Sequence, residues 1–198
     1  MAAQVVSLES ASGKHMKIKF KSNLGLLMLL LLAIVSGANG QAAENNDPAN
    51  EFYRLTKAAP ATFSARDYSK ARELARSLLI EAEVWKTNWN YGNAVHAANL
   101  VLGRVALVEG DTDEAKKFLL EAGKTPGSPQ LNSFGPDMLF AREMLKRGEK
   151  EMVLRYFDLC AKFWPARFSN LDEWRASIAK GETPDFGANL RYIFSNER

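Results

Sequence analysis

Cysteine and histidine are scarce in this sequence: 198 residues include one cysteine, Cys160, and two histidines, His15 and His96. A disulfide framework within one chain is therefore excluded, and the fold depends on its hydrophobic core. Metal sites take several ligands at set spacings, and no HxxxH, HExxH or CxxC motif is present. A Gly-x-Ser-x-Gly nucleophile turn is also missing. We therefore expect no metal, no cofactor and no enzymatic activity.

No hydrophobic run is long enough for an ordinary transmembrane helix, which takes roughly 20 apolar residues. The longest run, Leu24–Val35, follows three lysines within residues 17–21 and precedes small polar residues. This pattern is typical of an export signal, and Met16 is an alternative start. We expect cleavage near Gly40, with Ala38 as the other candidate, which leaves no stable membrane span. The alternative is an uncleaved membrane anchor.

A strong net charge is missing once this leader is set aside. Residues 1–40 contain four lysines and one glutamate, so the rest holds 22 basic and 22 acidic residues. The basic isoelectric point of the whole chain therefore comes mostly from the leader. Because nucleic-acid binding requires a basic face or stripe, we expect no nucleic-acid partner.

The tripeptide at residues 123–125, Gly-Lys-Thr, lacks the rest of a phosphate-binding loop. Such a loop has a further glycine five positions before the Gly-Lys pair, and Phe118 stands there. The tripeptide also follows a predicted helix, whose C-terminal end carries partial negative charge and repels phosphate. We therefore expect no nucleotide site.

The dominant pattern is helical, and it predicts an all-α fold. Helices are expected over residues 50–59, 67–86, 93–109, 112–122, 136–147, 149–163 and 170–180. Pro60 should interrupt the first of them, Asp111 should cap the fourth, and Pro136 suits a first helical position. The segment KTPGSPQLNSFG reads as a loop. Residues 1–40 are assigned to the leader, 41–50 to a flexible spacer, 51–181 to the helical domain and 182–198 to a C-terminal tail.

Three of the predicted helices carry the same apolar stripe, at offsets 0, 3, 4 and 7. The stripes are Ala71, Leu74, Ala75 and Leu78; Ala115, Phe118, Leu119 and Ala122; and Val153, Tyr156, Phe157 and Cys160. The preceding helices align with the same 38-residue shift, which places Gly103 on Ala141. Small residues there allow two helix backbones to approach closely. The pattern predicts a helical hairpin used twice and partly preserved a third time, with Cys160 buried and unreactive.

Over residues 97–165 the chain resembles the tetratricopeptide (TPR) family. The matching positions are Leu102-Gly103, Gly110-Asp111, Ala115 and Ala122, then Gly148, Phe157 and Pro165. The chain also resembles small exported bacterial proteins that share the TPGSPQLNSFGP and Phe-Trp segments and have no assigned activity. The TPR resemblance implies antiparallel helical hairpins stacked as a short solenoid. The helix at 170–180 is expected to cap the last hairpin.

The same resemblance implies a concave groove that faces a partner. Arg104 and Arg142, each following the Leu-Gly position of its unit, would point into it and hold a carboxylate or acidic peptide. The apolar residues of this binding groove would be Leu100, Leu107, Met138 and Leu145. The alternative is that both arginines pair with Asp or Glu of neighbouring helices.

A candidate polar site lies on one face of the helix at 93–109. Asn93, His96 and Asn99 follow one another at three-residue spacing. His96 would serve either as a general base, with a nearby carboxylate, or as a hydrogen-bonded structural histidine. Phe186, Tyr192 and Phe194 form an aromatic cluster in the tail, which either folds back on the helices or adds to a partner.

The sequence therefore predicts a periplasmic or secreted adaptor that binds a protein or peptide without catalysis. Helical repeats accept many partners, so the partner's identity does not follow. One alternative is an envelope hydrolase or lyase that uses His96. Another is a structural subunit of an envelope complex, which would expose large apolar patches.

Overall fold

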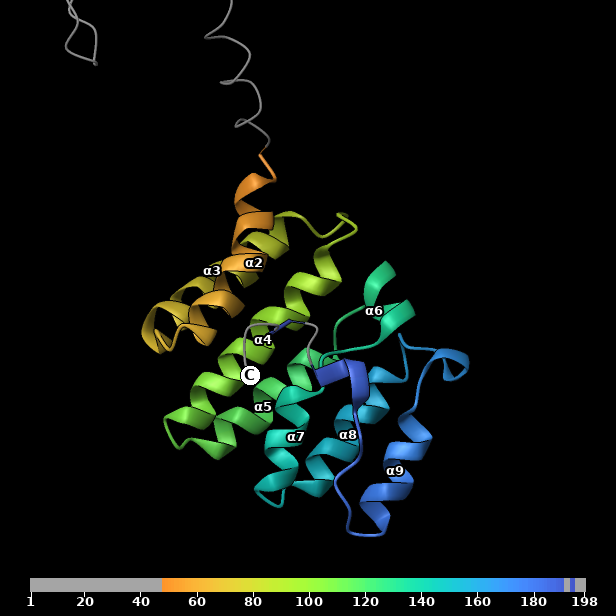
Figure 1. Cartoon of the computed structure of the whole chain (residues 1–198). Coiled ribbons are helices and arrows are strands. Elements are labelled where there is room, and N and C mark those ends of the chain that lie inside the picture. The colour runs from red at the N-terminus through yellow and green to blue at the C-terminus, as the bar shows by residue number, and fades with distance from the viewer. Residues whose placement is uncertain (1–47, 191–192, 195–198) are drawn as a thin grey trace, which may run out of the picture. The chain divides into compact units, whose positions relative to one another are not determined.

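The computed structural model describes residues 48–190 and 193–194 (Figure 1). The leader at 1–40, its cleavage site and Tyr192 lie outside these residues, as do residues 41–47 of the spacer predicted at 41–50. Within the described ranges the chain forms eight α-helices, two short 3-10 helices and no strand, so the all-α prediction is confirmed. None of these helices is both long enough and apolar enough to span a bilayer.

Most predicted helices form close to their expected ends. The elements are α2 (Asn50–Ser64), α3 (Tyr68–Val84), α4 (Tyr91–Val108), α5 (Thr112–Gly123), α6 (Pro129–Phe134), α7 (Leu139–Lys146), α8 (Lys150–Cys160), η1 (Ala166–Phe168), α9 (Leu171–Ala179) and η2 (Gly187–Leu190). The expected cap of α5 is present, because the Asp111 side chain accepts the N–H of Glu114 at 2.8 Å. Since α5 ends at Gly123, the Gly-Lys-Thr tripeptide lies at a helix C-terminus, as expected.

The prediction that Pro60 interrupts the first helix is wrong, because α2 continues to Ser64. A proline inside a helix removes one backbone hydrogen bond and costs about 3 kcal/mol. Here the helix buries Phe52 and Leu55 before the proline and Phe63 after it. The helix is therefore held on both sides of Pro60 by core packing, which outweighs the local cost.

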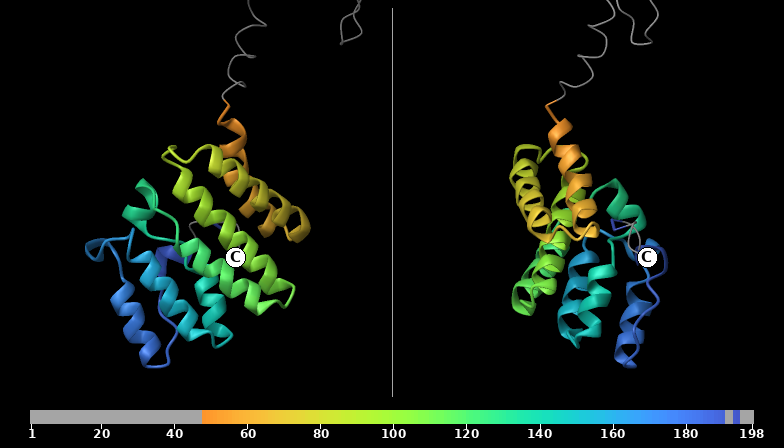
Figure 2. Two further views of the ribbon diagram at one scale, coloured as in Figure 1. Left: turned by 180° about the vertical axis from the view of Figure 1, so that it is seen from behind. Right: turned by 60° about the vertical axis from the view of Figure 1, so that its left-hand side comes forward.

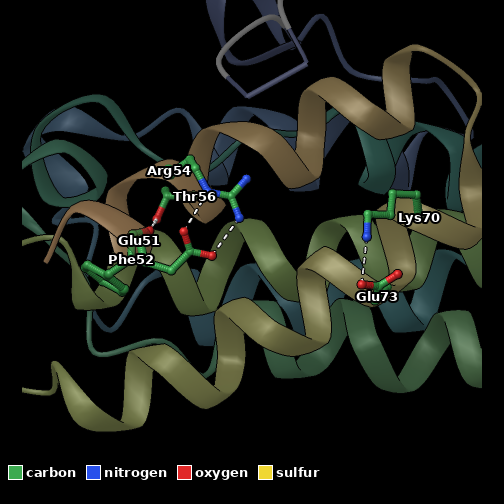
Figure 3. Close-up of polar contacts among 6 residues, drawn as sticks. All are labelled: Glu51, Phe52, Arg54, Thr56, Lys70 and Glu73. Atoms are coloured by element: carbon green, nitrogen blue, oxygen red, sulfur yellow. Dashed lines mark hydrogen bonds and ion pairs between the residues drawn. The ribbon is translucent and has the colours of Figure 1, made fainter. Parts of the chain in front are cut away.

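Surface ion pairs lie along the first two helices. Figure 3 shows Arg54 paired with Glu51 on α2 and Lys70 with Glu73 on α3, both one helical turn apart. The figure also shows the hydroxyl of Thr56 donating to the carbonyl oxygen of Phe52, at 2.9 Å. Exposed pairs of this kind are screened by solvent and contribute little to stability, so the core and not the surface charge stabilises these helices.

The segment predicted as a loop contains a short helix, α6. Ser128 caps it by accepting the N–H of Leu131 at 3.0 Å, and Pro129 occupies its first turn. Serine followed by proline is a helix-start signal, so the sequence carried the information. The prediction that Pro136 opens the next helix is also wrong. Helix α7 begins at Leu139, whose N–H donates to Asp137 Oδ1 at 2.8 Å.

The three predicted apolar stripes lie in the core. Eleven of the twelve side chains are at most 9% exposed, and Phe118 is partly buried against the others. The stripes lie on α3, α5 and α8. Cys160 is fully buried, as predicted. The helices that present these stripes therefore share one hydrophobic core.

Many helices pack against the helix that follows them in the chain. Helix α2 packs on α3, α3 on α4, and α4 on α5, while α5 packs on α8 and α8 on α7 and α9 (Figure 2). Helices α4 and α7 approach closely at Gly103, where an added Cβ would lie 2.3 Å from a ring carbon of Phe140. A small residue is required at this crossing, as the sequence predicted.

The tail folds back on the helices, which decides between the two alternatives left open by the sequence. Phe186 packs edge-on against Trp174 of α9 and Phe157 of α8. Phe194 lies beside Phe63 of α2, with ring centroids 5.7 Å apart. In Figure 1 the blue C-terminal segment returns from α9 toward the middle helices. Phe186 and Phe194 therefore belong to the core.

Candidate binding groove

Arg104 of α4 is buried and paired. Its Nε and Nη2 atoms donate to the two carboxylate oxygens of Glu143 on α7, at 2.9 and 2.6 Å. Its guanidinium carbon lies 4.4 Å from the ring centres of both Phe63 and Phe194. The structure thus shows for Arg104 the alternative interpretation, an ion pair with a neighbouring helix. Its charged face is not free to bind a separate carboxylate.

Arg142 lies on α7 and is partly buried. Its Nε atom is enclosed and has no hydrogen-bond partner among the described residues. Glu143, the next residue along α7, binds Arg104. The two arginines predicted to act as a pair therefore have different surroundings, one neutralised by a carboxylate and the other without such a partner.

The predicted apolar groove lining requires correction. Leu100 and Met138 are completely buried, so neither presents surface to a partner. Leu107 is 5% exposed but lines a surface cavity, and Leu145 is partly buried against the core. The sequence predicted that these residues, which lie on α4, just before α7 and on α7, line the groove. It did not distinguish the core from the groove, because both take leucine and methionine.

A cavity of about 500 Å³ lies between α2, the start of α4, α6 and the tail; we call it the polar cavity. Its lining includes Thr56, Lys57, Pro60 and Ser64 of α2, Asn93 and His96 of α4, and Leu131 and Ile193. Two residues of the predicted polar site thus line it. Asn99 does not, because its amide turns back and donates to the carbonyl oxygen of Val95 at 2.8 Å.

Asn93 is held by a network that links α4 to α6. Its amide donates to Asn90 Oδ1 and to Gln130 Oε1, both at 2.9 Å. Its own oxygen accepts from the hydroxyl of Ser128, at 2.5 Å. An asparagine with these three bonds is largely satisfied, so its role in the wall of the polar cavity is mainly structural.

His96 is fully buried and held by one hydrogen bond. Because the Ala122 carbonyl oxygen can only accept, Nδ1 carries the proton and donates to it at 3.0 Å. Burial lowers the pKa of His96 to about 4. The ring is therefore neutral at physiological pH, and its buried Nε2 has no partner among the described residues. No Asp or Glu of the described chain lines the polar cavity, so the carboxylate needed for general acid-base work is missing there.

A second cavity, of about 360 Å³, lies further along α4; we call it the basic cavity. Phe63, Leu107 and Val108 supply its apolar wall. Its charged residues are Arg104, Glu143, Lys146 and Arg147. Lys146 and Arg147 are exposed, and neither forms an ion pair with the described residues. Since Glu143 neutralises Arg104, the basic cavity carries an uncompensated positive charge.

Ile193 and Phe194 of the C-terminal tail lie between the two cavities. Ile193 lines the polar cavity, and Phe194 packs on Arg104, which lines the basic cavity. Two hydrogen bonds hold the tail backbone. The Met138 N–H donates to Asn189 O at 2.7 Å, and the Ile193 N–H donates to Asp137 Oδ2 at 2.9 Å. The residues that contact Asn189, Ile193 and Phe194 form the tail seat; they are Phe63, Arg104, Asp137 and Met138. We call the surface formed by both cavities and the tail seat the groove. Sequence reasoning missed this seat, although the tail aromatics were a signal for it.

Comparison of the chain with protein-family models, with curated proteins and with solved structures finds no match. The described residues contain no group of three His, Cys, Asp or Glu side chains placed to hold a metal ion. The chemistry of the groove itself is therefore the basis for assigning a function.

Proposed function

We propose that this protein is an exported, non-catalytic adaptor that binds an extended segment of a protein or peptide in the groove. The observation that carries the proposal is the seat of the chain's own tail. Backbone hydrogen bonds at Asp137 and Met138 hold the tail, and a phenylalanine ring fills the space against Arg104. Main-chain bonds combined with a side-chain anchor are the usual basis of peptide recognition.

The helical scaffold supports the proposal. We interpret α2 with α3, α4 with α5, and α7 with α8 as three TPR-like hairpins, with α9 as the cap. The equivalent buried stripes on α3, α5 and α8 support this interpretation. In such an arrangement the first helices of successive hairpins line one surface, and α2, α4 and α7 supply residues to the groove. The basic and apolar leader in the sequence supports export to the periplasm or the medium.

An envelope hydrolase or lyase is the second candidate, because the polar cavity is lined by His96. Its chemistry argues against this role. A histidine with a pKa of about 4 is a weak base, and its free Nε2 is enclosed. A structural subunit is a third candidate, supported by exposed apolar side chains such as those of Trp89 and Phe134.

The proposal is tested by blocking the groove without disturbing the core. Val108 lines the basic cavity and is 51% exposed, so Val108→Trp adds bulk there with little internal strain. Ile80→Trp, at a 70% exposed site outside both cavities, is the matched control. The tagged mature form is used to capture partners from an envelope extract, with mass spectrometry of the eluate. We expect Val108→Trp to lose partners that the wild type and Ile80→Trp retain. Identical partner sets for all three proteins would refute a groove-binding adaptor.

A further inference from the structure

We propose that the groove selects an extended peptide in which an aromatic residue is followed about three residues later by a carboxylate, and that this peptide displaces the chain's own tail. The inference rests on the function proposed above and deepens it by naming the partner's chemistry. It is argued from the tail seat, where one occupant is visible, and from the charge that this occupant leaves exposed.

The aromatic anchor site is built from Phe63 and Arg104. The Phe194 ring is 1% exposed and lies 4.4 Å from the guanidinium carbon of Arg104. The Phe63 ring lies at the same distance from that carbon, and the two rings meet edge to face at 68°. Glu143 fixes the guanidinium plane through two hydrogen bonds. A cation is attracted to the face of an aromatic ring, so an aliphatic side chain would bind at this position less tightly than an aromatic one.

The hydrogen bonds to the tail backbone fix the direction in which a bound segment runs, and they place no requirement on its side chains. Asp137 and Met138 bind main-chain groups of the tail, at Ile193 and Asn189. Ile193 lies at the polar cavity and Phe194 at Arg104, where the basic cavity begins. A segment that continues in the same direction therefore leaves the anchor site toward the basic cavity. Because an extended chain advances about 3.3 Å per residue, the third following residue reaches roughly 10 Å.

The basic cavity supplies the preference for a carboxylate. Lys146 and Arg147 line it, are exposed, and have no acidic partner among the described residues. In the part of the chain that the structure describes, the only carboxylate lining the basic cavity is that of Glu143, which is bound to Arg104. A partner's carboxylate there would be attracted by two cations, and within the described ranges it would meet no acid that is not already paired.

The tail itself has this pattern in its sequence, since Glu197 follows Phe194 by three residues. It is therefore a competitor built into the chain. A partner can bind only the molecules whose groove is not occupied by the tail. Its apparent affinity is therefore reduced in proportion to the fraction of such molecules. Loosening the tail should consequently strengthen binding, an effect opposite to that of general destabilisation.

The experiment uses the full mature chain and a fluorescent, C-terminally amidated peptide with the sequence of residues 186–198. We expect Phe194→Ala to bind this peptide at least about tenfold more tightly than the wild type. Phe168→Ala removes a 52% exposed ring outside both cavities and is the matched control, with wild-type affinity expected. Circular dichroism establishes that each variant is folded. If Phe194→Ala unfolds, Ile193→Ala replaces it, because this change also weakens the tail contact.

Two altered peptides separate the elements of the motif. A peptide with alanine in place of phenylalanine at position 194 should bind at least about tenfold more weakly, and one with glutamine at position 197 about three- to tenfold more weakly. In the Phe194→Ala chain, the added changes Lys146→Gln and Arg147→Gln should remove the difference between the glutamate and glutamine peptides. Lys117→Gln with Lys162→Gln, at positions outside both cavities, should preserve it.

The outcomes distinguish the two proposals. Binding that requires neither the aromatic residue nor the carboxylate would overturn this inference and leave the groove adaptor standing. No binding of any peptide to Phe194→Ala would overturn both. A wild-type dimer in sedimentation that Phe194→Ala abolishes would identify the tail of a second copy as the occupant, which also overturns the proposal of a separate partner.

Discussion

Asp137 and Ile193, 56 positions apart in the chain, are joined by a hydrogen bond of 2.9 Å from the Ile193 N–H to Asp137 Oδ2. The other oxygen of the same carboxylate accepts the N–H of Leu139, at 2.8 Å. One fully buried side chain thus caps the start of α7 and holds the tail. Asp137 therefore couples the start of α7 to the tail, in addition to the Met138–Asn189 backbone bond and the packing of Phe194.

Replacing Asp137 with alanine should release the tail. Both backbone N–H groups lose their acceptor, and a buried unsatisfied donor costs about 1–3 kcal/mol. We expect a lower free energy of unfolding in urea and faster tryptic cleavage after Arg191. Asp172→Ala, at a 95% exposed side chain, should change stability by no more than about 0.5 kcal/mol. Equal cleavage rates in the wild type and Asp137→Ala would contradict the described tail contact.

Replacing Glu143 with alanine should destabilise the protein by about 2 kcal/mol or more. Arg104 has a side chain only 6% exposed, and this change leaves its charge without the carboxylate that it binds. Chemical denaturation measures the loss. The control is Glu182→Ala, an exposed site where a change within about 0.5 kcal/mol is expected. A Glu143→Ala protein as stable as this control would show that the buried pair contributes nothing.

The pH dependence of stability should report the burial of His96. Its folded pKa, about 4, lies below the unfolded value near 6.5, so the unfolded chain takes up the proton first. The stability associated with the neutral ring is therefore complete above pH 6.5 and is lost as the pH falls to 4, by about 3 kcal/mol in all. Unfolding of wild type and His96→Gln at several pH values isolates this contribution. Parallel stability curves for the two proteins between pH 6.5 and 4 would disprove it.

Cys160 should resist alkylation in the native protein. The thiol is fully buried, and burial raises its pKa well above the usual range, so little reactive thiolate forms. We expect iodoacetamide to label the native chain at least roughly a hundredfold more slowly than the chain in guanidinium, because labelling requires opening. Mass spectrometry over time measures both rates. Rapid labelling of the folded form would place Cys160 at the surface and remove the stripe on α8.

Local features of the fold were predictable because their causes lie within a few residues of each other. The 0, 3, 4, 7 spacing of Val153, Tyr156, Phe157 and Cys160 forces one apolar helix face, and all four are buried. The cap at Asp111 follows from its side chain and the next turn. The errors arose where two local signals competed or packing intervened. Pro60 argued for a helix end, yet Phe63 packs beyond it in the same helix.

The candidate site was predictable only in part. Arg104 was predicted to face the groove, with an ion pair to a neighbouring helix as the alternative, and its partner Glu143 lies 39 positions away in the chain. No periodicity specifies which acidic residue of another helix faces it. His96 and Asn93 were grouped on one helix face, and both line the polar cavity. Asn99, on the same predicted line, is turned away because its amide bonds to its own helix.

By itself the sequence determined an all-helical chain with three buried stripes and a buried cysteine, because helical period, caps and side-chain polarity act within single elements. Only the tertiary structure decided that Phe194 fills the space against Arg104 and that this arginine is already neutralised. Those relationships depend on how separate helices and the returning tail meet in space. Such contacts are selected by the packing of the whole core, and no short stretch of sequence encodes them.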